Sequence, residues 1–116
     1  TTSEHIKEAE DKRNQVNRDV RNIKDLNDIK NMYAESISMS QKIRVGIPRM
    51  KNVRAQKLMT SNVTNIVTSL NDSINFITKI LSSNFFSMPD TERMDLIKKE
   101  RSKVFLRKSQ LASYLN

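Results

Sequence analysis

The stretch that decides the fold is residues 44–57, which read RVGIPRMKNVRAQK. It holds the only glycine of the sequence, Gly46, and one of the two prolines, Pro48. Neither residue type occurs between residues 4 and 44, so that region can form one long helix ending near Gly46. We therefore predict a helix over 4–44, a turn over 45–48 that reverses the chain, and a second helix over 49–81.

Apolar residues along 4–44 recur at steps of three and four, as on a helical face. A first stripe runs to Ile23, then slips in phase by three residues and continues through Leu26, Tyr33 and Ile37. A second stripe lies on another side of the helix and consists of Ile29, Met32, Met39 and Ile43. Two stripes imply two neighbours. We expect the later half of this helix to pack between other elements of the chain or between subunits, and the second stripe is a candidate contact to another subunit or a partner.

The helix over 49–81 shows the clearest pattern. Its apolar line consists of Met59, Val63, Ile66, Leu70, Ile77 and Ile80, with Ser73 in the remaining slot. A loop over 82–89 follows, and its Phe85 and Phe86 are expected either to close the end of a bundle or to anchor a partner or oligomer contact. A third helix over 90–115 carries Met94, Ile97, Val104, Leu111 and Leu115 on one face.

These elements predict an all-α chain of one domain spanning 1–116. A long antiparallel helical hairpin would have the third helix packed back on it, as in a coiled-coil-like three-helix bundle. At 1.5 Å per residue the helix over 4–44 would span roughly 60 Å and the third only roughly 40 Å. Part of the hairpin then lacks a third helix, so we predict a homo-oligomer. Arg101 and Lys108 fall on the third helix's face; we expect them to snorkel or pair with acids of 4–44, or else to line a polar interface.

The composition argues against enzyme chemistry. One Gly, one His and no Cys leave no phosphate loop, thiolate metal site or cysteine nucleophile. We therefore expect no enzymatic activity, no cofactor, no metal and no small-molecule substrate. No apolar run approaches the roughly 18 residues of a membrane span, and no secretory signal is visible, so we expect a cytoplasmic protein.

Charge is the one feature that points to a partner. The 21 Lys and Arg exceed the 13 Asp and Glu by eight. No acid occurs over residues 36–71, whereas that stretch supplies six cations, Lys42, Arg44, Arg49, Lys51, Arg54 and Lys57. A hairpin turn at 45–48 would gather them at one end. On the third helix, Lys99, Lys103 and Arg107 form a second basic ridge at four-residue steps.

Such a cationic end favours nucleic acid, because phosphate contacts require little beyond positive charge. Aromatic residues do not alternate with the cations, so we predict backbone contact to DNA or RNA with little sequence preference. The competing interpretation is a solubilising surface. Two other functions remain open: a helical adaptor that docks another protein, such as an acidic one, through its apolar stripes, and, least favoured, a peripheral binder of anionic membranes.

Overall fold

The computed structural model describes residues 2–8, 20, 23–82 and 88–116. Its regular elements in these ranges are all helical: α2 (Lys24–Gly46), the short 3₁₀ helix η1 (Ile47–Arg49), α3 (Val53–Ile80) and α4 (Asp90–Leu115). Residues 2–8 are helical as well. The predicted all-α class is confirmed for this part of the chain. Phe85 and Phe86, and with them most of the predicted loop, lie outside the described residues.

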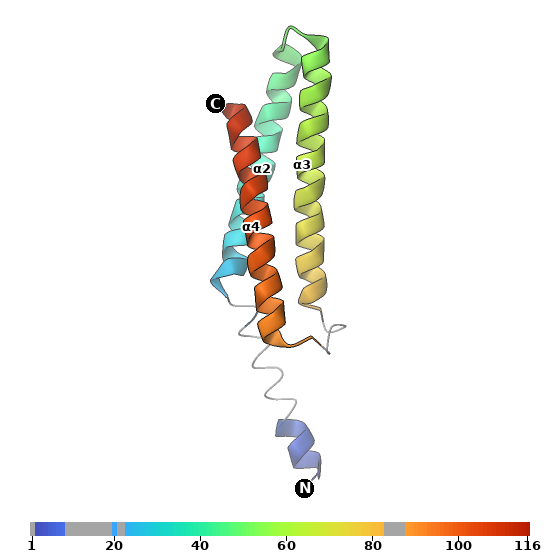
Figure 1. Cartoon of the computed structure of the whole chain (residues 1–116), viewed down its shortest axis with the longest axis vertical. Coiled ribbons are helices and arrows are strands. Elements are labelled where there is room, and N and C mark those ends of the chain that lie inside the picture. The colour runs from blue at the N-terminus through green and yellow to red at the C-terminus, as the bar shows by residue number, and fades with distance from the viewer. Residues whose placement is uncertain (1, 9–19, 21–22, 83–87) are drawn as a thin grey trace.

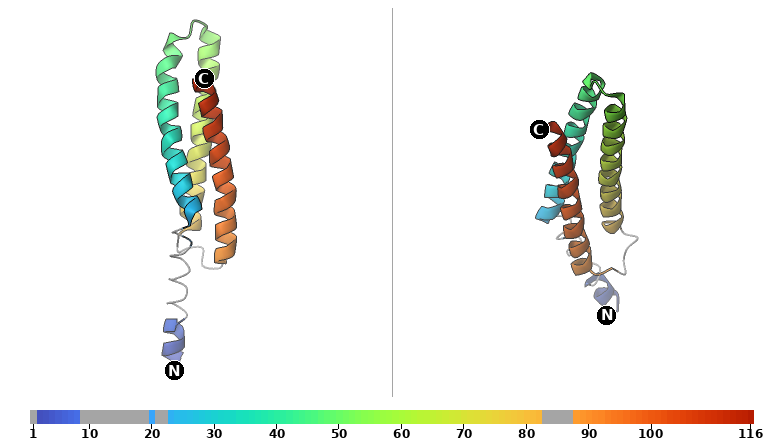
Figure 2. Two further views of the ribbon diagram at one scale, coloured as in Figure 1. Left: turned by 90° about the vertical axis from the view of Figure 1, so that its left-hand side faces the viewer. Right: turned by 45° about the horizontal axis from the view of Figure 1, so that its top comes forward.

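The three long helices lie side by side (Figures 1 and 2). α2 and α3 run in opposite directions and are joined by η1, and α4 runs antiparallel to α3. α4 packs more extensively on α2 than on α3. Its C-terminal end stops short of η1, so the last turns of the α2–α3 hairpin extend past it (Figure 1).

The predicted continuous helix over 4–44 is wrong at Ile23. This residue is extended, with φ −65° and ψ 146°, and α2 begins only at Lys24. The break coincides with the three-residue slip in the apolar stripe. A straight helix would carry the later apolar residues to a different side, whereas the break lets Val20 and Ile29, at 1% and 2% exposure, both reach the core.

The reversal of the chain also lies later than predicted. Gly46 is still the last residue of α2, and its right-handed φ of −78° makes no use of glycine's conformational freedom. Pro48 sits in the first turn of η1, where its missing N–H is not needed. The side chain of Asn52 accepts a hydrogen bond of 3.1 Å from the Ala55 N–H and caps α3. The second helix therefore starts at Val53 rather than at residue 49, and the turn occupies 47–52.

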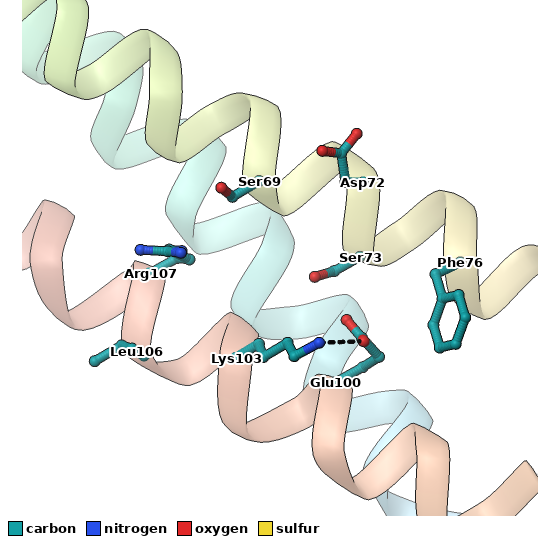
Figure 3. Close-up of a pocket in the computed structure, with 8 residues that line it drawn as sticks. All are labelled: Ser69, Asp72, Ser73, Phe76, Glu100, Lys103, Leu106 and Arg107. Atoms are coloured by element: carbon teal, nitrogen blue, oxygen red, sulfur yellow. Dashed lines mark hydrogen bonds and ion pairs between the residues drawn. The ribbon is translucent and has the colours of Figure 1, made fainter.

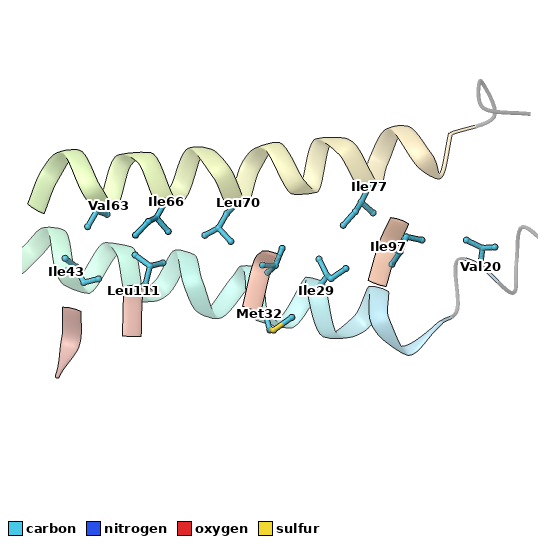
Figure 4. Packing of buried hydrophobic residues seen from close by; sticks show 11 residues of the cluster. Val20, Ile29, Met32, Ile43, Val63, Ile66, Leu70, Ile77, Ile97 and Leu111 are labelled. Atoms are coloured by element: carbon cyan, nitrogen blue, oxygen red, sulfur yellow. The ribbon is translucent and has the colours of Figure 1, made fainter. Parts of the chain in front are cut away.

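The core follows the apolar line of α3 (Figure 4). Its predicted members Val63, Ile66, Leu70, Ile77 and Ile80 are all buried, as is Ser73, while Met59 is half-buried. The third helix lies where it was predicted, at about 90–115, and Ile97, Val104 and Leu111 each have 0% exposure. Of its other expected face residues, Met94 is half-buried against the core and Leu115 is 45% exposed.

α2 brings both aliphatic and small residues to the core. Ile29, Met32 and Ile43 are buried there, and Met39 packs against the same cluster. A contact of these residues to a subunit or partner stays a prediction. Of the two expected neighbours, the structure shows other elements of the same chain: α3 and α4 cover that face. Ser36 and Ser40 are buried between them, and their hydroxyls donate to carbonyl oxygens of α2 itself, those of Met32 and Ile37.

Candidate polyanion-binding site

Six cations gather at the end of the α2–α3 hairpin; we call Lys42, Arg44, Arg49, Lys51, Arg54 and Lys57 the basic tip. The last turns of α2 carry the first two, η1 and the residues after it carry Arg49 and Lys51, and the first turns of α3 carry the remaining two. The predicted gathering of these residues therefore follows from the backbone: the chain reverses within their span (Figure 1).

Two local contacts fix the turn that carries these side chains. The Asn52 cap holds the start of α3, and the Gln56 side-chain amide donates a hydrogen bond of 2.6 Å to the Met50 carbonyl oxygen. Both contacts join the segment after η1 to the first turns of α3. The backbone that carries Arg49 and Lys51 is thus held in a fixed position relative to the start of α3.

None of the six tip cations forms an ion pair with any residue that the structure describes. All six are exposed. The nearest acids along the chain are Glu35 and Asp72, and Glu35 is already paired with Lys108 of α4. No carboxylate of the described residues therefore pairs with the tip cations, and counterions held by such cations are released on binding a polyanion.

The cations of α4 differ from those of the tip, because several of them serve the fold. Arg101 Nε lies 3.1 Å from an oxygen of Asp28 and 3.6 Å from one of Asp25, and Lys108 pairs with Glu35. The expected pairing of Arg101 and Lys108 with acids of the first predicted helix is thus confirmed. These pairs fasten α4 to α2.

The second predicted basic ridge does not join the tip. Lys103 Nζ is 3.1 Å from a Glu100 oxygen, and Arg107 donates to the Gln110 side-chain oxygen at 3.0 Å. Lys99 is exposed on the same helix. Lys103 and Arg107 line a space beside the middle of α3 instead, so we assign this ridge no share in the tip.

Sequence reasoning missed the aliphatic side chains that stand among the tip cations. Val45, Val53 and Leu58 are 65%, 62% and 63% exposed. On α3, Val53 and Lys57 are four residues apart, and so are Arg54 and Leu58, so cations and aliphatics alternate on one exposed helical face. The sequence could have indicated this exposure. Val53 and Leu58 do not belong to the buried apolar line that starts at Met59, so they were candidates for exposed positions.

A shallow depression of about 440 Å³ lies beside these residues, lined by Ile47, Pro48, Gln56, Lys57, Thr60 and Ser61. Its walls supply the Lys57 cation and the Ser61 hydroxyl, while the Thr60 hydroxyl and the Gln56 amide already donate to the carbonyl oxygens of Gln56 and Met50. A phosphate group can be held there by charge and hydroxyl contacts without any shape-specific readout.

Other chemistry finds little support in the described part of the chain. His5 is exposed, and among the described residues no three His, Cys, Asp or Glu side chains converge as metal ligands. No described helix combines the length and apolar character needed to cross a bilayer. Comparison with protein-family models, with curated proteins and with solved structures finds no match to this chain.

Proposed function

We propose that this protein is a non-enzymatic accessory factor that binds the phosphate backbone of DNA or RNA through its basic tip, with little dependence on base sequence. In this proposal α2, α3 and α4 act as one bundle that holds the tip out at one end. The carrying observation is a contrast between two sets of cations: those of the tip are all exposed and unpaired with described residues, while Arg101, Lys103 and Lys108 are engaged by carboxylates of the fold.

The tip has no aromatic residues, which supports binding to the phosphate backbone rather than recognition of bases. Tyr33 lies away from the tip, with its hydroxyl donating to Asn71 at 2.6 Å, and Phe105 lies on α4. Stacking platforms for single strands place aromatic rings among the cations. The tip offers aliphatic side chains there instead, and these would pack against sugars, a contact that does not distinguish bases.

The decisive experiment measures affinity for a short duplex by fluorescence anisotropy at several salt concentrations. If about five phosphates are neutralised, affinity should fall roughly 500-fold between about 50 and 200 mM salt. Replacing Arg44, Arg49, Lys51, Arg54 and Lys57 by Gln should abolish binding while the far-ultraviolet circular dichroism spectrum stays unchanged.

A matched control removes the same amount of charge elsewhere. The residues replaced by Gln in this variant are Lys7, Lys24, Lys30, Lys79 and Lys98, all of them exposed. It should retain most of the affinity. Equal losses in both variants would mean that net charge, rather than the tip, drives association. A wild-type chain that binds equally well at low and high salt, or that does not bind at all, would remove the proposal.

The exposed aliphatic residues of the tip favour one alternative, a helical adaptor that docks an acidic protein. Alternating cations and aliphatics on the first turns of α3 would suit a partner helix with acidic and apolar residues. The two functions separate on the Val53→Gln, Leu58→Gln double variant. If the protein binds the phosphate backbone, this double variant should keep its affinity for the duplex within about threefold, because the charges that supply the affinity are unchanged. If the protein is an adaptor instead, neither the wild-type chain nor the double variant should bind the duplex.

A further inference from the structure

The depression beside the basic tip joins a cation to an apolar surface. η1 lines it with Ile47 and Pro48, and the first turns of α3 line it with Lys57 and its neighbours. Lys57 belongs to the basic tip, and none of the described residues in the wall is acidic. A phosphate group can therefore be bound at Lys57 by charge. The volume of about 440 Å³ leaves room for more than a phosphate, since a water molecule in the liquid occupies only about 30 Å³.

Thr60, which also lines the depression, is not in a state to bind a phosphate. Its hydroxyl donates a hydrogen bond of 2.9 Å to the Gln56 carbonyl oxygen, one helical turn earlier. A hydroxyl has a single hydrogen, so the Thr60 oxygen retains only lone pairs that accept hydrogen bonds. The oxygens of a phosphate diester are acceptors too and cannot bond to it. A group that binds at Thr60 must therefore donate a hydrogen.

The side chain of Gln56 adds a second acceptor to the same wall. Its Nε2 donates a hydrogen bond of 2.6 Å to the Met50 carbonyl oxygen, which fixes the side chain. Its Oε1 oxygen accepts no hydrogen bond from the residues that the structure describes. The depression thus combines one cation, acceptors that require a donor, and the apolar surface of Ile47 and Pro48.

The larger space between α3 and α4 lacks this combination. It has a volume of about 520 Å³, and Asp72 and Glu100 line it together with Lys103 and Arg107 (Figure 3). Lys103 is bound to Glu100 at 3.1 Å. A phosphate would meet two carboxylates in this space, so the depression beside the tip is the better place for a backbone contact.

We propose that this depression is a subsite for one ribose–phosphate unit, so that the polymer bound at the tip is RNA rather than DNA. The two backbones share the phosphate and differ at the ribose 2′-hydroxyl, which can donate a hydrogen bond. In the subsite the phosphate lies at Lys57 and Ser61, the sugar packs on Ile47 and Pro48, and the 2′-hydroxyl donates to the Thr60 oxygen. This inference rests on the proposed function and names its polymer.

The first test compares an RNA duplex with a DNA duplex of the same sequence by fluorescence anisotropy. The RNA duplex should bind about threefold to tenfold more tightly, the gain expected from one added hydrogen bond. A 2′-fluoro RNA duplex keeps the A-form helix but has no 2′ donor, so it should bind like the DNA duplex. If it binds as tightly as RNA, helix shape rather than the 2′-hydroxyl is recognised, and the proposal is overturned.

Thr60→Val tests the acceptor while keeping the shape of the side chain. It should weaken binding of the RNA duplex by about threefold to tenfold and leave the DNA duplex within about twofold. The dependence of affinity on salt should not change, because no charge is removed. Thr60→Ser, which keeps the hydroxyl, should retain the affinity for RNA. Circular dichroism should show the same helix content in both variants.

Thr78→Val is the matched control. Thr78 is exposed on the same helix, and its hydroxyl donates to the Ile74 carbonyl oxygen at 2.9 Å, as that of Thr60 does to Gln56. At 1.5 Å per residue it lies roughly 27 Å from Thr60 along α3. The substitution should affect neither duplex. An equal loss of RNA affinity in Thr60→Val and Thr78→Val would overturn the proposal.

The failure of this inference and that of the proposed function give different results. Equal affinity of the wild-type chain for RNA and DNA overturns the inference and leaves the proposed function intact, whereas failure to bind either duplex removes both. Adenosine 5′-monophosphate at about 1 mM should not displace the RNA duplex, because a single nucleotide cannot bind several tip cations at once. Displacement would assign the depression to free ribonucleotides instead of RNA.

Discussion

Gly46 and Asn52 have different parts in forming the hairpin turn. The cap from Asn52 stabilises the start of α3 at a position where the backbone would otherwise leave N–H groups unsatisfied. Gly46 has a right-handed helical φ, and a β-carbon added to it would meet no atom within 4 Å. Proline and capping, rather than glycine's flexibility, therefore build the reversal.

A substitution at Gly46 tests this assignment. Gly46→Ala should raise the free energy of unfolding by about 0.4–1 kcal/mol, because alanine restricts the unfolded chain and suits the native backbone. Urea denaturation with an unchanged slope would measure it. Val45→Ala, at an exposed position in the last helical turn of α2, should change stability by less than about 0.5 kcal/mol. Destabilisation by Gly46→Ala would show that the turn does need glycine.

On the scale of single elements, α2 packs closely on α4 although it carries serines in the core. Ser36 and Ser40 are 0% and 1% exposed. Because their hydroxyls are bonded within α2, they leave no buried donor unsatisfied. Small side chains at these positions leave room for a neighbouring helix, so α2 depends on their size as much as on its aliphatic residues.

Enlarging one of these serines should disrupt the packing. Ser36→Leu should cost about 1–3 kcal/mol through overpacking, whereas Ser36→Ala should stay within about 1 kcal/mol, since only a local hydrogen bond is lost. Thermal and urea unfolding would measure both. Ser38→Leu on the exposed side of α2 is the control and should change stability by less than about 0.5 kcal/mol. If Ser36→Leu were neutral, the space beside Ser36 would not be filled by neighbouring residues.

The helices differ in how far the sequence predicts them. The apolar faces of α3 and α4 were predictable because their seven-residue spacing is regular, and the start of α4 was predictable from Pro89 and Asp90. The start of α3 was predicted four residues too early, because the Asn52 cap was not identified. The break at Ile23 was not predicted, because no Gly or Pro lies there. The change of phase in the apolar stripe at this position was the one sequence feature that indicated it. The aliphatic residues of the second α2 stripe were identified as apolar, but pattern alone could not distinguish an intramolecular neighbour from a second subunit.

On the scale of the whole molecule, ion pairs join segments that are far apart in the sequence. Arg101 contacts both Asp25 and Asp28, and Lys108 contacts Glu35. These ion pairs join α4 to α2 at two places along the helices. Their side chains are partly exposed, which limits each pair to about 0.2–1 kcal/mol. These contacts set the position of α4 along α2, and the apolar core supplies most of the stability.

Removing both cations should show this limited contribution. The Arg101→Gln, Lys108→Gln double variant should lose about 1–2 kcal/mol of unfolding free energy at low salt. The loss should shrink in about 1 M salt, where charges are screened within about 3 Å. Lys98→Gln with Lys99→Gln removes the same charge from exposed positions of α4 and should have little effect. A loss that does not depend on salt would assign the two side chains a packing role instead.

The basic tip was the part of the candidate site that the sequence could predict, since a chain reversal within a stretch free of acids must gather its cations. The space between α3 and α4 that Lys103 and Arg107 line could not be predicted. It depends on which face of α4 meets α3, and Glu100 and Arg107 can be placed opposite Ser73 and Asp72 only when the rotation of both helices is known. Helical periodicity gives the face of one helix, but not its register against another.

The short reach of α4 has a consequence for the motion of the hairpin end. Among the described elements, the outermost turns of α2 and α3 pack on each other and on η1 beyond the end of α4 (Figure 1), and aliphatic residues there, such as Val45 and Leu58, are largely exposed. Segments with few buried contacts open at a lower free energy than the core. The end of the hairpin can therefore open locally, with α2 and α3 still joined through η1, while the part of the bundle that α4 covers stays folded.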